Sequence, residues 1–98
     1  MKVYSMTSPR TGNAVANQFE IYDGSKVYFQ SYRSLIAEYD GETLTLGCDW
    51  DYSRTTMKYL TAWLNDHCAR LFGDLVINSA NIRRLISKGV IRYNPEMI

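Results

Sequence analysis

The stretch that decides the fold is SRTTMKYLTAWLNDHCARL, residues 53–71. Its apolar face follows the three- and four-residue spacing of a helix and carries Leu60, Trp63, Leu64, His67 and Leu71. The opposite side carries the polar residues Arg54, Lys58, Thr61 and Asn65. Asp51 or Ser53 is suited to cap its start, and Gly73 to end it. The spacing therefore predicts one long amphipathic helix from Ser53 to Leu71.

Upstream of this helix, Asp23-Gly24-Ser25 separates the β-prone segments QFEIY and KVYFQSY. Burial of the apolar residues favours a three-residue loop, which pairs Ile21 with Val27 and Phe19 with Phe29. In this register the residues that face away from the core are Glu20, Tyr22, Lys26 and Tyr28. We therefore predict a first hairpin with Phe19 and Phe29 on its buried face.

A second hairpin is predicted over residues 35–46, around Asp40-Gly41. A two-residue turn pairs Ala37 with Leu44 and Leu35 with Leu46. The residues predicted to face away are Ile36, Glu38, Thr43 and Thr45. An alternative for SLIAEY is a helical turn capped by Ser34. Two tandem hairpins make a four-stranded meander whose apolar face the long helix must cover.

The two ends of the chain complete the predicted architecture. Val3–Met6 is β-prone, and the residues that follow it, 8–13, are rich in turn formers. After a link at residues 75–77, Asn78 or Ser79 caps a brief helix through Ser87, and VIRY after Gly89 is a terminal strand. The buried stripe expected on that helix is Ile82, Leu85 and Ile86. The fold class is α+β: an antiparallel four-stranded meander packed by one long amphipathic helix, plus a short C-terminal helix and strand.

The composition indicates one domain, residues 1–98, with a single core, since 46% of the residues are hydrophobic. No apolar run approaches the roughly 18 residues that span a bilayer, and the N-terminus lacks the build of a signal peptide. We therefore expect a cytoplasmic protein of a bacterial host cell, without a membrane partner. Cys48 and Cys68 lie on different predicted elements and are expected to be buried or half-buried thiols.

The strongest candidate interaction surface is a basic set near the C-terminus. Residues 50–98 carry seven basic and four acidic side chains, whereas residues 1–49 carry four and six. The basic set consists of Arg83, Arg84, Lys88 and Arg92. It would contact phosphates or an acidic patch on a protein, unless it is an ordinary solvated helix face. Stacking of bases is also conceivable on Tyr4, Tyr22, Tyr28, Tyr32 and Tyr59.

Catalytic and metal-binding patterns are weak. His67 is the one histidine, and its neighbour Cys68 would point about a hundred degrees away from it on a helix. Six residues of types that bind metals lie in this region, but their spacing matches no recognised zinc or calcium site: Cys48, Asp49, Asp51, Asp66, His67 and Cys68. The glycines form no phosphate-binding motif. We therefore expect no catalytic residue, no metal and no cofactor.

Three stretches, TGNAVANQFEI, YFQSYRSLIA and WDYSRTTMKYLTAWL, resemble small, uncharacterised proteins encoded by phages, prophages and plasmids of Gram-positive bacteria. The resemblance covers Ser8 to Leu64 and implies an accessory protein of a mobile element. Trp50–Thr56 corresponds to the family's signature, which we expect to be structural, with Trp50 and Tyr52 fixing the helix on the sheet. After Leu71 the chain departs from the family pattern, and its special function is expected there.

The first functional hypothesis is a non-enzymatic protein that docks onto a host protein and inhibits a bacterial defence system such as CRISPR. The alternative is a small DNA- or RNA-binding module that uses the basic C-terminal helix and strand. A small hydrolase or nuclease has little support in the sequence. Salt-dependent binding that Arg83→Ala and Arg84→Ala weaken would favour the nucleic-acid alternative.

Overall fold

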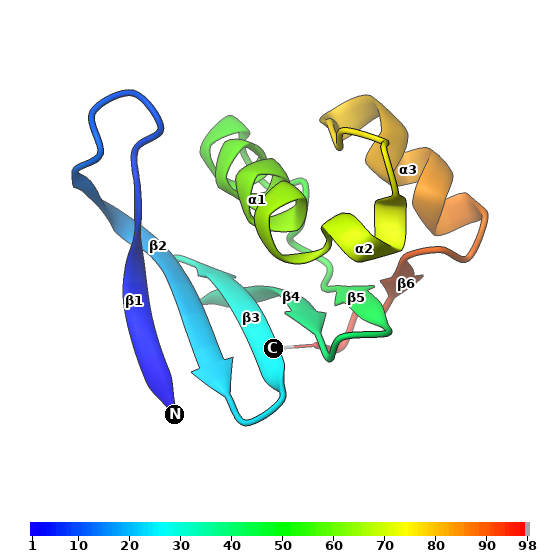
Figure 1. Cartoon of the computed structure of the whole chain (residues 1–98), viewed down its shortest axis with the longest axis horizontal. Helices are drawn as coiled ribbons and strands as arrows, with labels where there is room; N and C mark the ends of the chain where they lie inside the picture. Colours follow the sequence, from blue (N-terminus) through cyan, green and yellow to red (C-terminus); the bar gives the residue numbers. More distant parts are fainter. Residues whose placement is uncertain (98) are drawn as a thin grey trace.

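The computed structural model describes residues 1–97 and arranges them as a six-stranded sheet with three helices on one of its faces (Figure 1). The strands are β1 (Lys2–Thr7), β2 (Ala14–Asp23), β3 (Lys26–Ser31), β4 (Ser34–Tyr39), β5 (Leu44–Leu46) and β6 (Arg92–Tyr93). The helices are α1 (Arg54–His67), α2 (Ala69–Phe72) and α3 (Ser79–Ser87). The fold class is α+β, as predicted.

The sheet is wider than the predicted four-stranded meander, because both terminal segments join it. The strand order is β1-β2-β3-β4-β5-β6. At one edge β1 pairs antiparallel with β2, with Lys2 opposite Tyr22. At the other edge β6 pairs with β5 in parallel, which a strand returning from a helical layer can do. The sequence identified both segments as β-prone, but their pairing partners depend on the rest of the fold.

The register of the first hairpin differs from the prediction. Asp23 pairs with Lys26 and Glu20 with Phe29, so the turn consists of Gly24 and Ser25, and Gly24 has a φ of 61°. A one-residue shift moves every side chain of β2 to the other face. Phe29 is fully buried under the helices, and Glu20 shares its face of the sheet. In this register Phe19, which was predicted to be buried, lies on the sheet face away from the helices and is half-buried.

The second hairpin differs in the opposite sense, with a longer loop than predicted. Tyr39 pairs with Leu44 and Ala37 with Leu46, so four residues, 40–43, connect β4 to β5. Asp40 Oδ1 accepts hydrogen bonds from the backbone N–H of Thr43 at 2.7 Å and of Glu42 at 2.9 Å. These bonds, the one from Thr43 first, lower the pKa of Asp40. The Asp40 side chain thus stabilises this four-residue loop, which takes the place of the predicted two-residue turn at Asp40-Gly41.

The pairing of β3 with β4 contains a bulge that the sequence did not reveal. Phe29 pairs with Ala37 but Gln30 pairs with Leu35, which leaves Ile36 as an extra residue on β4. Ile36 and Ala37 are both buried, whereas Leu35 is half-buried. The expectation that Ile36 faces away is therefore wrong, and SLIAEY forms a strand rather than a helical turn.

Helix α1 begins where the sequence predicts but ends earlier. Ser53 Oγ accepts a hydrogen bond from the Thr56 N–H at 3.1 Å, so Ser53 is the N-cap. The face bearing Leu60, Trp63 and Leu64 is fully buried. The chain leaves the helix at Cys68, and α2 continues to Phe72 before Gly73 ends it. The predicted single helix is thus two helices.

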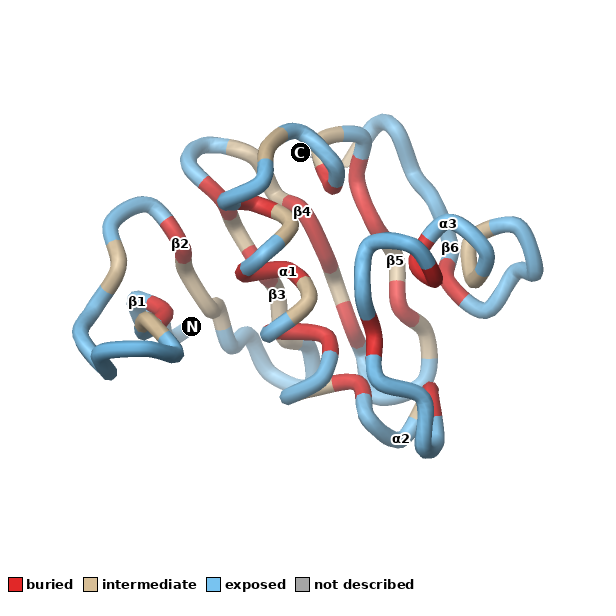
Figure 2. The backbone as a smooth tube through the Cα atoms, turned by 90° about the horizontal axis from the view of Figure 1, so that it is seen from above, coloured by how far each residue is buried: buried red, intermediate tan, exposed pale blue. Residues whose placement is uncertain are grey.

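The C-terminal helix agrees with the prediction. Asn78 caps α3 and forms a reciprocal capping box with Asn81. Ile82 on α3 is fully buried, and Ile91 just before β6 is almost so. Figure 2 shows the buried residues along β4, β5 and the side of α1 that faces them. The core therefore lies between the helical layer and one face of the sheet.

The other face of the sheet carries no helix in the described part of the chain (Figure 1). The strand registers place one row of residues across it: Val3, Ile21, Tyr28, Glu38, Thr45 and Arg92. None of the helices within residues 1–97 is long and apolar enough to cross a membrane.

Candidate functional site

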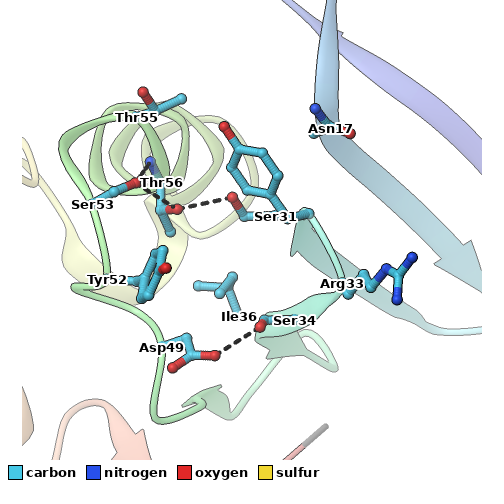
Figure 3. Close-up of a pocket in the computed structure, with 11 residues that line it drawn as sticks. Asn17, Ser31, Arg33, Ser34, Ile36, Asp49, Tyr52, Ser53, Thr55 and Thr56 are labelled. Atoms are coloured by element: carbon cyan, nitrogen blue, oxygen red, sulfur yellow. Dashed lines mark hydrogen bonds between the residues drawn. The ribbon is translucent and has the colours of Figure 1, made fainter.

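A surface pocket of about 810 Å³ lies between the β3–β4 turn and the start of α1 (Figure 3). Its walls come from Asn17 on β2, from residues 31–36 and from residues 49–56. Seven of its eleven lining residues carry a hydroxyl group. Its volume falls within the range of small-molecule and peptide-side-chain sites, and its surface is rich in hydrogen-bonding groups.

Side-chain hydrogen bonds join the opposing walls of this pocket. The hydroxyls of Ser31 on β3 and Thr56 on α1 lie 2.9 Å apart in a buried contact, and Ser53 Oγ donates to Thr56 Oγ1 at 3.1 Å. On the other side, Ser34 Oγ donates to Asp49 Oδ2 at 2.7 Å (Figure 3). These bonds link the turn to the residues around the helix start and connect the walls of the pocket.

The pocket wall includes two residues in the left-handed backbone region. Asn17 has a φ of 66° and Tyr32 a φ of 57°, and no other non-glycine residue within 1–97 has a positive φ. This conformation costs a residue such as Tyr32 about 1–2 kcal/mol, whereas asparagine adopts it more readily. The Tyr32 N–H donates to the Asn17 carbonyl at 2.7 Å, which fixes both residues. Such strain clusters at functional sites and is consistent with a preorganised wall.

Two exposed side chains flank the pocket. Tyr52 is 76% exposed, so the expectation that it fixes the helix on the sheet is wrong, whereas Trp50 is buried as expected. In Figure 3 the Arg33 guanidinium points away from Ser34, at the side of the pocket opposite Tyr52. Arg33 forms no ion pair with another described side chain. We call Tyr52, Tyr32 and Arg33 the pocket rim.

The three sequence stretches that carry the family resemblance all contribute to this pocket. Asn17 comes from the first stretch, residues 31–36 from the second and residues 52–56 from the third. The sequence alone does not show that these stretches meet, because their proximity depends on strand register and on the docking of α1. The signal that could have found the site was the density of hydroxyl side chains in the second and third stretches.

The structure divides the basic set that the sequence proposed as an interaction surface. Arg83 donates to Asp51 Oδ2 at 2.9 Å, and its guanidinium carbon lies 5.0 Å from the centre of the Trp50 ring. Arg84 on α3 and Lys88, the C-cap of α3, are exposed and one helical turn apart. Arg92 pairs with Thr45, which places it on the sheet face away from the helices. The set therefore forms no single basic face.

The tyrosines proposed for stacking also have different surroundings. Tyr59 is buried, and Tyr28 is half-buried on the sheet face away from the helices. Tyr4 and Tyr22 contact each other edge to face, with ring centres 5.7 Å apart. Tyr32, which is 50% exposed, is the member that lies at the pocket.

His67 lies outside the residues that line the pocket and packs near the core, as expected of a helix-face histidine. Its Nε2 lies 2.9 Å from Glu20 Oε1, a partner that the sequence analysis did not identify. Cys68 is buried as expected, whereas Cys48 is exposed, and both thiols are free within residues 1–97. The pocket hydroxyls therefore do not have an imidazole beside them.

The fold and the pocket define a small α+β domain with a one-sided helical layer and a hydroxyl-lined site at the start of its main helix. Residues 1–75 match a family of unknown function, DUF8033, and the chain belongs to that family. No curated protein and no solved structure matches the chain. The matched residues contain the whole pocket, whereas α3 and β6 lie beyond them.

Proposed function

We propose that this protein is a non-enzymatic binding protein that docks onto another protein through the pocket and its rim. The observation that carries this proposal is the composition of the site: exposed tyrosines and an arginine surround serine, threonine and asparagine side chains. Tyrosine gives a large amphipathic contact at a small entropic cost, and short hydroxyl side chains adapt their hydrogen bonds to the partner. Tyrosine and arginine are also enriched among the residues that dominate binding energy.

The rigidity of the site supports the same proposal. The Ser31–Thr56 and Ser34–Asp49 hydrogen bonds connect the pocket walls, and the Tyr32–Asn17 backbone bond fixes the turn. A preformed site loses little conformational entropy on association, so more of the contact energy contributes to affinity. A partner that inserts a polar loop into the pocket would contact Tyr52 on one side and Arg33 on the other.

The resemblance to proteins of phages, prophages and plasmids extends the proposal to the kind of partner. A mobile element's accessory protein acts inside its host, so we propose a host protein, with a component of a defence system such as CRISPR as the first candidate. The location of His67 away from the pocket supports a role without catalysis. Nucleic-acid binding through Arg84 and Lys88 is the second candidate, and their shared exposed helix face favours it.

The test is affinity capture of a stoichiometric partner from host lysate, followed by binding measurements with purified components. Tyr52→Ala and Arg33→Ala should each weaken binding by more than about 1 kcal/mol, or roughly fivefold. Two matched variants leave the pocket intact: Tyr93→Ala removes another exposed tyrosine, and Arg84→Ala removes another exposed arginine. Both should bind as the unmodified protein does.

Two results would contradict the proposed docking site. Loss of binding in Val3→Lys, with Tyr52→Ala unaffected, would place the interface on the sheet face away from the helices. Binding to duplex or single-stranded nucleic acid that falls steeply with salt and is lost in Arg84→Ala would favour the second candidate.

A further inference from the structure

A separate group of polar side chains lies at the end of α1, whereas the pocket lies at its start. Glu20 projects from β2, and Asp66 and His67 are the last two residues of α1. His67 Nε2 lies 2.9 Å from Glu20 Oε1 and 3.7 Å from Asp66 Oδ2. The three donor atoms all lie within 4.8 Å of one another. The fold thus brings together residues 47 positions apart in the sequence.

One hydrogen bond accounts for only one of the two carboxylates that lie near His67 Nε2. An imidazole nitrogen carries at most one proton. Nε2 can therefore donate a hydrogen bond to only one carboxylate. Here Glu20 and Asp66 both approach the same nitrogen, and two carboxylates this close repel each other. A divalent cation between the three atoms would accept the nitrogen lone pair and neutralise both carboxylates.

The surroundings of the group favour a positive charge. The C-terminal end of a helix carries a partial negative charge, and α1 ends at His67. Lys2 lines the hollow beside Glu20, but within residues 1–97 neither carboxylate forms an ion pair with a lysine or arginine.

We propose that Glu20, Asp66 and His67 form a binding site for a divalent first-row transition-metal ion. Ligand atoms at about 2.0–2.2 Å from a common ion lie about 3.0–3.4 Å apart, and the observed distances of 2.9 and 3.7 Å bracket this range. Imidazole selects zinc and its neighbours over magnesium and calcium, which take oxygen ligands. Asp66 is 73% exposed, so the remaining coordination positions are open to water.

The ion would act as a clamp between the sheet and the helix. Glu20 belongs to β2, near the sheet edge, while the other two ligands belong to α1, so coordination joins the two layers. An ion that binds only the folded protein stabilises it by mass action. At about a hundred times its dissociation constant, the rise in melting temperature would be on the order of 10 °C for a domain of this size.

The experiment uses the full chain, freed of metal with a chelator, and zinc chloride as the probe. Zinc titration by calorimetry should show one site per chain, and zinc should raise the melting temperature. Asp66→Ala should keep the fold, because the side chain is exposed, and should weaken zinc binding by at least about tenfold. Asp74→Ala removes one exposed negative charge elsewhere and is the matched control.

Cobalt distinguishes this site from the exposed Cys48 thiol. Cobalt bound by nitrogen and oxygen ligands gives visible absorption without the intense near-ultraviolet band of cobalt–thiolate bonds, and Cys48→Ser should leave that spectrum unchanged. Magnesium at the same concentration should not raise the melting temperature. No zinc-dependent stabilisation of the unmodified protein, or equal stabilisation of Asp66→Ala and the unmodified protein, would overturn the proposal.

Discussion

The two cysteines lie in opposite surroundings, although each follows or ends a regular element. Cys48 is exposed in the turn after β5, whereas Cys68 is fully buried where α1 meets α2. Burial raises the pKa of Cys68 to about 12. The thiolate is the reactive form of cysteine, so Cys68 is both inaccessible and protonated at neutral pH.

A thiol reagent such as a disulfide dye should therefore modify one cysteine of the native protein quickly and the second only after unfolding. The count of reacted thiols against time, without and with denaturant, measures this. In Cys48→Ser the fast phase should disappear while the denatured protein still reacts once. Fast reaction of two thiols without denaturant would show that the α1–α2 junction opens readily.

At the scale of elements, side-chain caps decide where the helices begin. Ser53 caps α1, and the reciprocal bonds of Asn78 and Asn81 start α3. Asn81 Nδ2 also donates to the Val76 carbonyl at 3.0 Å, which fixes the link that leads into the helix. A correctly placed start matters for α3, because its buried face is short and centres on Ile82.

Asn78→Ala removes the acceptor of two backbone N–H groups at the start of α3. We expect it to lower the free energy of unfolding by about 1–2 kcal/mol, as measured by urea titration. Ser79→Ala, at the next and exposed position, should change it by less than about 0.5 kcal/mol. Equal effects of the two substitutions would mean that the capping box does not stabilise the helix.

At the scale of the whole molecule, residues outside the family match complete the core. Ile77, Ile82 and Ile91 are buried in the same cluster as Trp63 and Leu46. Strand β6 also pairs with β5, and the N–H of Asn94 donates to the Leu46 carbonyl at 2.9 Å. The segment after residue 75 is therefore part of the domain rather than an appendage to it.

A chain ending at residue 75 should accordingly fail to fold cooperatively. Near-ultraviolet circular dichroism should lose its tertiary signal, because the buried face of β5 and α1 would be open to water. In the full chain, the milder substitution Ile91→Ala should lower the free energy of unfolding by about 2–4 kcal/mol. A truncated chain with a sharp thermal transition would show that residues 1–75 are a complete unit.

The amino-acid pattern by itself determined the elements. Helical periodicity located the buried face of α1, turn residues located the hairpins, and capping residues limited each helix start to two candidates, because these signals are local. It also identified the terminal segments as β-prone. It could not give their pairing, because the partner of β6 lies 47 positions away, with Thr45 opposite Arg92.

Only the tertiary structure decided the strand registers, and the sites depend on them. The predicted pairing of Ile21 with Val27 placed Glu20 away from the helices, whereas the observed pairing of Glu20 with Phe29 turns its carboxylate toward His67. The β3–β4 bulge likewise turns Ile36 into the pocket. Side chains of a strand alternate between the two faces of the sheet, so a register shift of one position exchanges the faces. Several long-range contacts together fix the register.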